Sequence, residues 1–319
     1  MPHLRRVVTV FVLTLSTCGV ALAQQNGCLE RTIPLTIRTA NPGPDIALST
    51  ADLQGSYLGK AVQIGSFGSA DSIKPRIVFL VEISGSMQPT GSLQDWNFPL
   101  DVTRDLILRT PSDVEVGVAF FTNSLQHVID PTTDHNKPVA EVEAVRSLRG
   151  EAPREVGEPP LWDAIRGGAD LLAPAHVGDA VYAIVHGREH GSKTTVQIAT
   201  QAMVGTGIRL FAVLMTDQPR VPYGRLPFQP SESQKQFLQI VNDTGGTQIT
   251  IPRGSGLSRM AFPMVEAALD GQYRQLFHVY PLTINLPEPV DKPREWRLNL
   301  RDKKSGIELV YPKTLFPCS

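Results

Sequence analysis

An unbroken apolar run, Ile77 to Val81, leads directly into a short polar turn. The turn reads Glu82-Ile83-Ser84-Gly85-Ser86-Met87. An apolar run of this length is typical of a strand that is buried on both faces of a parallel sheet. The turn then lies at the carboxyl edge of the sheet, where open α/β sheets bind ligands. The run therefore favours a layered fold with helices on both sides of a sheet.

The turn brings three oxygen-bearing side chains close together. Glu82 carries a carboxylate, and Ser84 and Ser86 carry hydroxyl groups. Such donors suit magnesium, calcium or manganese better than zinc. Because serine and glycine are also common turn residues, a solvated turn that binds nothing is the alternative.

Strands and helices alternate from Arg76 to about Tyr273. This alternation predicts right-handed crossovers and a doubly wound, mostly parallel α/β sheet. The expected strands are Ile77 to Val81, Val114 to Phe121, Ala180 to Val185, Ile208 to Met215 and Gln248 to Ile251. The expected helices are Pro99 to Leu108, Val139 to Leu148, Leu161 to Leu172, Lys193 to Gly205, Ser231 to Thr244 and Leu257 to Asp270. Ser231 and Gln234 have the spacing of a capping box.

Both ends of the chain have a different, β-like pattern. Short alternating runs separated by turns occur from about residue 30 to 70 and again after Tyr273. Neither segment is long enough to bury a core alone, so we expect them to form one small β layer together. The predicted parts are a signal peptide (1–23), an N-terminal β segment (24–72), the α/β domain (73–272) and a C-terminal β segment (273–319).

The first residues have the form of a secretory signal. Arg5 and Arg6 precede the apolar stretch Val7 to Val20, and Ala21-Leu22-Ala23 supplies small residues at the positions that a signal peptidase reads. We expect cleavage after Ala23 and export to a periplasm or the cell exterior, with no membrane span left. The alternative is an uncleaved anchor, although the apolar stretch is short for a bilayer.

Cleavage would leave two cysteines, Cys28 and Cys318, near the two ends of the mature chain. An exported protein meets an oxidising compartment, so one disulfide could tie the termini together if the terminal segments pack side by side. Two unrelated cysteines are the alternative.

Composition bears mainly on the partner. The chain has 319 residues, of which 41% are hydrophobic, and this is enough to bury a core. Its formal net charge is −1, and basic residues are not clustered with aromatic ones. We therefore do not expect nucleic acid as a partner.

The segment from Arg76 to Leu269 resembles a von Willebrand factor A-type (VWA) domain, in particular that of bacterial secreted proteins. In that family a buried strand ends in Asp-x-Ser-x-Ser, and this turn, a threonine from a second loop and an aspartate from a third surround one divalent ion. Here Glu82 stands at the position of the first aspartate. Two further stretches carry the resemblance, namely Gly157 to Ile165, which is similar to Gly-Gly-Thr-x-Leu-Tyr-Asp-Ala-Ile, and Leu238 to Gly246, which is similar to a helix that ends in Thr-Gly-Gly.

The same comparison shows departures at the ion. Pro159 replaces the threonine and has no side-chain donor, and His186 replaces the second aspartate. Magnesium requires a tight oxygen shell, so we expect no cofactor and no tightly bound magnesium. The alternative is that Mg, Mn, Ca or Zn is held by Glu82, Ser84, Ser86 and His186. Asp163, in the first turn of its helix, is expected to have a structural role.

By resemblance, the function is non-enzymatic binding or adhesion to another protein through the loops at the carboxyl edge of the sheet. No catalytic residues are expected. The residues predicted for this binding face are Glu82, Ser84, Ser86, Met87, Pro159, Trp162 and His186. Of these, Met87 and Trp162 are expected to provide apolar contact.

Two other functions use the same residues. His186-Gly-Arg-Glu189-His190 has the His-x-x-Glu-His form of zinc peptidases, in which both histidines lie on one face of a helix. Gly187 and Gly191 oppose a helix there. The third candidate is an envelope scaffold that has no ligand-binding face.

Overall fold

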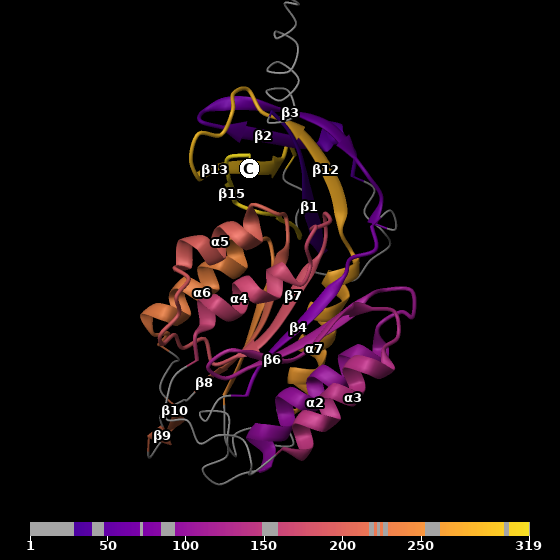
Figure 1. The fold of residues 1–319 in the computed structure, drawn as a ribbon. Coiled ribbons are helices and arrows are strands. Elements are labelled where there is room, and N and C mark those ends of the chain that lie inside the picture. Colours follow the sequence, from indigo (N-terminus) through magenta and orange to yellow (C-terminus); the bar gives the residue numbers. More distant parts are fainter. Residues whose placement is uncertain are drawn as a thin grey trace, which may run out of the picture.

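The computed structural model describes residues 29–39, 48–70, 73–83, 93–148, 159–216, 220–221, 224–225, 229–252, 262–302 and 306–318. Two sheets built from different parts of the chain lie one above the other in Figure 1. One sheet has helices on both faces. The other is made from the two terminal segments.

The sheet with helices has six strands in the order β11-β8-β7-β4-β5-β6. Its strands are β4 (Ile77–Glu82), β5 (Val116–Phe121), β6 (Leu125–Thr132), β7 (Ala180–Val185), β8 (Arg209–Thr216) and β11 (Gln248–Pro252). All neighbours pair in parallel except β5 and β6. The chain starts in the middle, moves to one edge, and then returns to fill the other side, which is the doubly wound order. The predicted fold class of the α/β domain is therefore confirmed.

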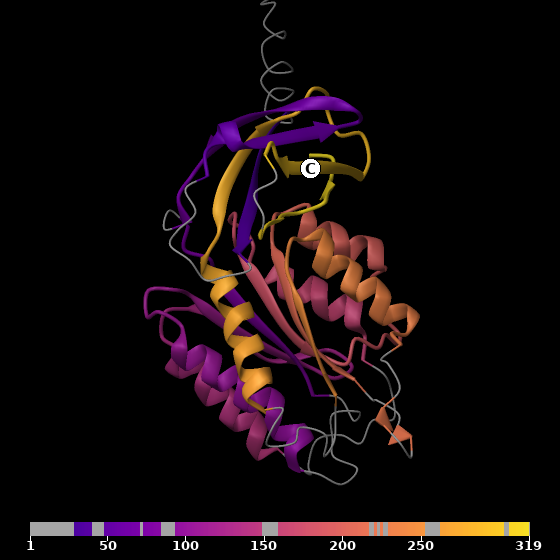
Figure 2. The same ribbon diagram turned by 180° about the vertical axis from the view of Figure 1, so that it is seen from behind.

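Helices cover both faces of this sheet (Figures 1 and 2). On one face lie α2 (Leu93–Arg109), α3 (Asn136–Ser147) and α7 (Phe262–Phe277), and on the other α4 (Leu161–Asp170), α5 (Val196–Val204) and α6 (Glu232–Asp243). β4 contributes Phe79 to the first core and Leu80 to the second, and both are fully buried. This two-sided burial is the physical reason for the apolar run in the sequence.

Most predicted elements are present with shifted ends, but β6 was not among the predicted strands. This edge strand is only partly buried and contains Pro131, so its pattern does not resemble that of a buried strand. Its pairing with β5 is irregular near Val118. Gly117 permits the close approach, since a Cβ there would lie 2.8 Å from the backbone oxygen of Ile129. The predicted capping box of α6 is confirmed, with Ser231 and Gln234 each bonding the other's backbone N–H.

The second sheet has seven strands in the order β14-β1-β12-β3-β2-β13-β15, with antiparallel pairing throughout. Its N-terminal strands are β1 (Glu30–Thr39), β2 (Leu53–Tyr57) and β3 (Lys60–Phe67). Its C-terminal strands are β12 (Tyr280–Asn285), β13 (Arg294–Leu300), β14 (Ile307–Val310) and β15 (Thr314–Leu315). The sheet has its own apolar core, in which Trp296 Nε1 donates to the Pro312 carbonyl at 2.7 Å. It is larger than the small layer that the sequence suggested.

Local details differ from the sequence-based expectation at two places. Within the N-terminal β segment, the β-like run expected at Ser49 to Leu53 begins as a 3-10 helix, Thr50–Asp52, rather than as a strand. α7 extends to Phe277, so the predicted domain boundary after residue 272 falls inside a helix. A short two-stranded pair, β9 (Arg220–Val221) and β10 (Gly224–Arg225), follows β8.

Two predictions depend on residues outside the described ranges. The predicted signal peptide lies wholly outside them. Among the described helices, none is long and apolar enough to cross a membrane. Cys28 also lies outside, whereas Cys318 is exposed and free. The signal and the disulfide stay predictions.

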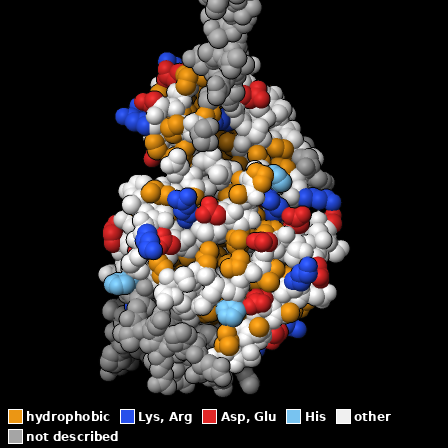
Figure 3. All heavy atoms as spheres, in the orientation of Figure 1, with side chains coloured by type: hydrophobic (Ala, Val, Ile, Leu, Met, Phe, Trp, Pro, Cys, Tyr) orange, Lys and Arg blue, Asp and Glu red, His pale blue; other side chains and the backbone are white. Residues whose placement is uncertain are grey.

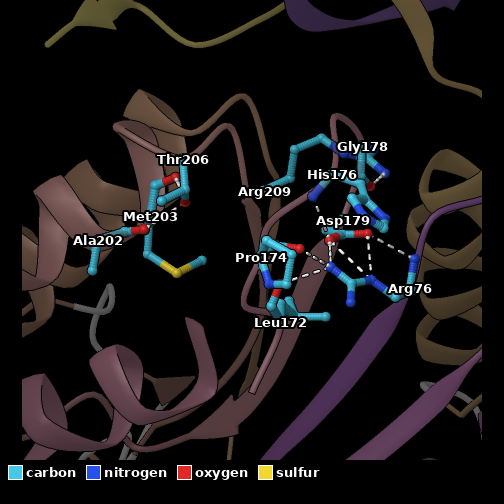
Figure 4. A network of polar contacts seen from close by, with 10 residues as sticks. All are labelled: Arg76, Leu172, Pro174, His176, Gly178, Asp179, Ala202, Met203, Thr206 and Arg209. Atoms are coloured by element: carbon cyan, nitrogen blue, oxygen red, sulfur yellow. Dashed lines mark hydrogen bonds and ion pairs between the residues drawn. The ribbon is translucent and has the colours of Figure 1, made fainter. Parts of the chain in front are cut away.

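Asp179 is the centre of a buried charge network at the amino end of the six-stranded sheet (Figure 4). Its Oδ2 lies 2.5 Å from Arg76 Nη2, and its Oδ1 accepts from the Arg76 backbone N–H at 3.0 Å. The backbone N–H of His176 donates to Oδ2 at 2.9 Å. Because Arg76 precedes β4 and Asp179 precedes β7, the network sets the starting points of two central strands.

Arg209, the first residue of β8, connects this network to α7. Its guanidinium donates to the carbonyls of Gln275 (2.9 Å) and Leu276 (2.7 Å) in the last turn of the helix. It also donates to the carbonyl of Gly178 at 2.8 Å. Burial lowers the pKa of Arg209 to about 9, and the negative charge of Asp179 opposes that shift. The side chain is therefore still charged at neutral pH and stabilises the carbonyl end of the helix.

Replacing Asp179 with alanine tests this network. Asp179→Ala leaves Arg76 without its ion-pair partner and removes the negative charge near Arg209, so we expect the free energy of unfolding to fall by about 3–5 kcal/mol. Urea denaturation measures the change. Asp113→Ala removes an exposed ion pair with Lys74 and is the control, for which no measurable change is expected. Equal effects of the two variants would contradict the importance of the network.

Candidate functional site

Two predicted site residues, Glu82 and His186, meet at the carboxyl edge of the six-stranded sheet. Glu82 is the last residue of β4, and His186 follows the neighbouring strand β7. The His186 backbone N–H donates to Glu82 Oε2 at 2.8 Å, and His186 Nδ1 lies 3.1 Å from Oε1. The two side chains are 0% and 2% exposed, respectively. The pair is therefore part of the interior.

Glu82 contacts His186 through both of its carboxyl oxygens, one at the backbone N–H and the other at ring nitrogen Nδ1. A third element holds the pair, since Gln234 in the first turn of α6 donates from Nε2 to the His186 carbonyl at 2.7 Å. The spacing of Ser231 and Gln234 predicted only a capping box and gave no sign of this second hydrogen bond.

The turn after His186 requires glycine. Gly187 has φ of +69°, and a Cβ there would lie 2.7 Å from Leu214 Cδ1. Both conditions exclude an ordinary side chain without strain. The loop therefore packs closely against Leu214 of β8 directly after the Glu82–His186 pair.

The described residues fit a magnesium ion poorly. Both oxygens of Glu82 face His186, and Pro159 offers its carbonyl to the backbone N–H groups of Leu161 and His190. Among the described residues, no group of three or more His, Cys, Asp or Glu could hold a metal ion. Ser84, Ser86 and Met87 lie outside the described residues, so their roles, and the predicted weakness of metal binding, stay predictions.

Pro159 and Trp162 do not lie where a binding face requires them. Pro159 is buried, and the Trp162 side chain is 5% exposed in the core between α4, α5, α6 and the sheet. The expectation of an exposed aromatic anchor at Trp162 is therefore wrong. Its helix is rotated so that the residue after Leu161 also faces the sheet.

The His-x-x-Glu-His sequence does not form the helix that a zinc peptidase needs. Residues 186–190 have no regular secondary structure. Glu189 instead accepts from the backbone N–H of Ser192 (2.8 Å), from Ser192 Oγ (2.8 Å) and from the backbone N–H of Trp162 (3.2 Å). It acts as a cap for the N-terminus of α4, where free N–H groups and the helix dipole favour a carboxylate. The hydrolase prediction lacks its geometric basis in this segment.

Asp163 holds the same loop from the helix side. Its carboxylate accepts from the backbone N–H groups of Lys193 (2.9 Å) and Thr194 (2.7 Å). Burial raises the pKa of this carboxyl, but hydrogen bonds from Thr194 and Lys193 outweigh burial, so the pKa is below its usual value. The predicted structural role of Asp163 agrees with these bonds. Ser192, which also approaches the Trp162 N–H at 3.1 Å, had no recognisable signal in the sequence.

Comparisons with known proteins give structural similarity only. No protein-family model and no curated protein matches the chain. Solved structures similar to it include BatB from Bacteroides thetaiotaomicron (15% identity, TM-score 0.46, covering 63% of this chain and 97% of that one). Others are a von Willebrand factor type A protein from Catenulispora acidiphila (12%, TM-score 0.46, covering 90% and 75%) and the ArnB paralog VWA2 from Sulfolobus acidocaldarius (12%, TM-score 0.42, covering 91% and 76%).

Neighbouring substitutions separate capping from catalysis. Glu189→Ala removes the cap of α4, so we expect the free energy of unfolding to fall by about 1–2 kcal/mol. His190→Ala changes an exposed neighbour and should leave stability unchanged. Urea denaturation and a casein hydrolysis assay are run on both variants. An unchanged free energy of unfolding in Glu189→Ala would contradict the capping role, and casein hydrolysis by the wild type that disappears in His190→Ala would support the hydrolase.

Metal titration tests the Glu82–His186 pair. We expect calorimetry with magnesium, calcium, manganese and zinc to show no micromolar magnesium binding, because the Glu82 carboxylate is directed at His186. His186→Ala should lower the free energy of unfolding by about 1.5–3 kcal/mol, since a buried carboxylate loses a partner. The exposed His176→Ala is the control. Micromolar magnesium binding by the wild type would show that the loop carries a complete ion site.

Proposed function

We propose that this protein is a non-enzymatic module that binds another protein through the carboxyl edge of the six-stranded sheet. One observation carries the proposal: the charged groups that a metal or hydrolytic site would use are committed to holding the loops. Glu82 binds His186, and Glu189 binds the N-terminus of α4. The loop after β7, held by these contacts, is a suitable base for polypeptide recognition.

The proposed face has an exposed, described part after β7. His190, Gly191 and Lys193 are exposed there, directly above the capped N-terminus of α4. The Glu82–His186 pair, Pro159 and Trp162 would support this face from beneath rather than contact the partner. Ser84, Ser86 and Met87 remain proposed contacts, because they follow Glu82 closely in the sequence.

The distribution of charged side chains and the net charge are compatible with a protein partner. On the face seen in Figure 3, acidic and basic side chains are interspersed among apolar ones, with no extended patch of one sign. The formal net charge of −1 adds no attraction for nucleic acid. We place this binding, including any adhesive use, outside the cytoplasm because of the signal-like N-terminal sequence.

Site-directed photo-cross-linking tests the proposed face. A photoreactive residue at position 190 should cross-link a protein in envelope extracts of the producing cells, because His190 is exposed at the proposed face. The same residue at Ala144, exposed on α3, is the matched control and should give no comparable product. Equal labelling from both positions, or none from position 190, would contradict the proposed face and favour an envelope scaffold.

A further inference from the structure

A cleft of about 350 Å³ lies between the two sheets, at the opposite end of the six-stranded sheet from the proposed face. One wall is the start of β1, from Glu30 to Pro34, and another is formed by Pro312 and residues 314–316 around β15. The remaining wall is Val177 with the turn after α5, residues 204–207. We call this the edge cleft.

The edge cleft runs along the edge of β1 rather than over one of its faces. Five consecutive residues, Glu30 to Pro34, line it. Neighbouring residues of a strand point to opposite faces, so a cavity that all of them touch must follow the strand's edge.

The pairing of β1 leaves this edge open. Along Glu30–Leu35 the strand pairs with β12 only, and its pairing with β14 starts at Thr36. Within the described residues no strand pairs with the second side of Glu30–Leu35. β15, which faces it across the cleft, is itself a terminal strand that pairs only with β13.

The register shows which backbone groups point into the opening. Pro34 lies opposite Pro281, and since neither has an N–H, this is a non-hydrogen-bonded pair. Leu286 donates to the Leu29 carbonyl at 2.9 Å, so odd-numbered residues of β1 bond β12. The even-numbered residues Glu30 and Thr32 therefore direct N–H and C=O groups away from β12, towards the edge cleft.

Arg31 adds a charged donor to the cleft. Its Nη2 donates to the Phe316 carbonyl at 3.3 Å, which bridges β1 to the segment after β15. Its Nε is buried and makes no hydrogen bond with any described residue. Arg31 lines the cleft, and a carboxylate is the partner that the terminal N–H groups of a guanidinium fit best.

We propose that the edge cleft binds an extended peptide segment of another protein, which adds as a strand to the open edge of β1 and presents an acidic side chain to Arg31. Backbone bonds to Glu30 and Thr32 supply affinity, and Arg31 supplies selectivity. The charge of Arg31 and the exposed backbone pairing groups together favour a peptide over a small anion, which would use only the guanidinium.

A matched pair of substitutions at Thr32 tests the proposal. Thr32→Pro and Thr32→Val both remove the hydroxyl that contacts Thr283, but only proline also removes the outward N–H. A random heptapeptide library displayed on phage is selected on the mature protein, and enriched peptides are then measured by fluorescence anisotropy. We expect acidic, β-branched peptides that bind wild type and Thr32→Val equally and bind Thr32→Pro about tenfold more weakly.

A substitution at Arg31 provides a second, independent test. Arg31→Gln should weaken the same peptides about tenfold and remove the preference for acidic residues, even if Thr32→Pro fails to fold as judged by circular dichroism. No enriched peptide, or equal binding by Arg31→Gln, would overturn the proposal. Complete competition by N-acetylglutamate amide at the peptide's own concentration would indicate a small-anion site. Self-association in sedimentation that Arg31→Gln abolishes would indicate a second copy of the chain as the occupant.

Discussion

The buried guanidinium of Arg209 connects the six-stranded sheet to α7, the helix that leads into the second sheet. A guanidinium that is removed from water requires hydrogen-bond acceptors on several sides. Arg209 donates to two carbonyls in the last turn of α7 and to the Gly178 carbonyl, and the negative charge of Asp179 also favours its charged form. α7 leads directly into β12, a central strand of the second sheet. Hydrogen bonds from Arg209 at the amino end of the six-stranded sheet therefore hold the last turn of the helix that leads into the second sheet.

This arrangement gives the two ends of the six-stranded sheet different properties. The amino end is closed by the Asp179 network and lies beside the second sheet, whose incomplete pairing leaves the edge cleft. The carboxyl end has loops that are held by Glu82, Asp163 and Glu189. The two surfaces that we propose for binding therefore lie at opposite ends of the six-stranded sheet.

Prediction from the sequence succeeded where burial leaves a continuous pattern. β4 and β7 are buried on both faces, and their apolar runs located them closely. β6 was missed because an edge strand is partly solvated and tolerates Pro131. Trp162 was assigned to the surface because a family resemblance locates a loop but does not give the rotation of the helix that follows it. The open edge of β1 was not predictable either, since it depends on which distant strand stops short.

The sequence alone determined the alternation of strands and helices, the two-sided burial of the central strands and the β character of both termini. These properties follow from local patterns of apolar and polar residues, which burial imposes residue by residue. Only the tertiary structure decided which charged groups meet. Glu82 and His186 are 104 positions apart, and Arg76 and Asp179 are 103 apart. They become neighbours because parallel strands align their corresponding ends, and no local pattern encodes that pairing.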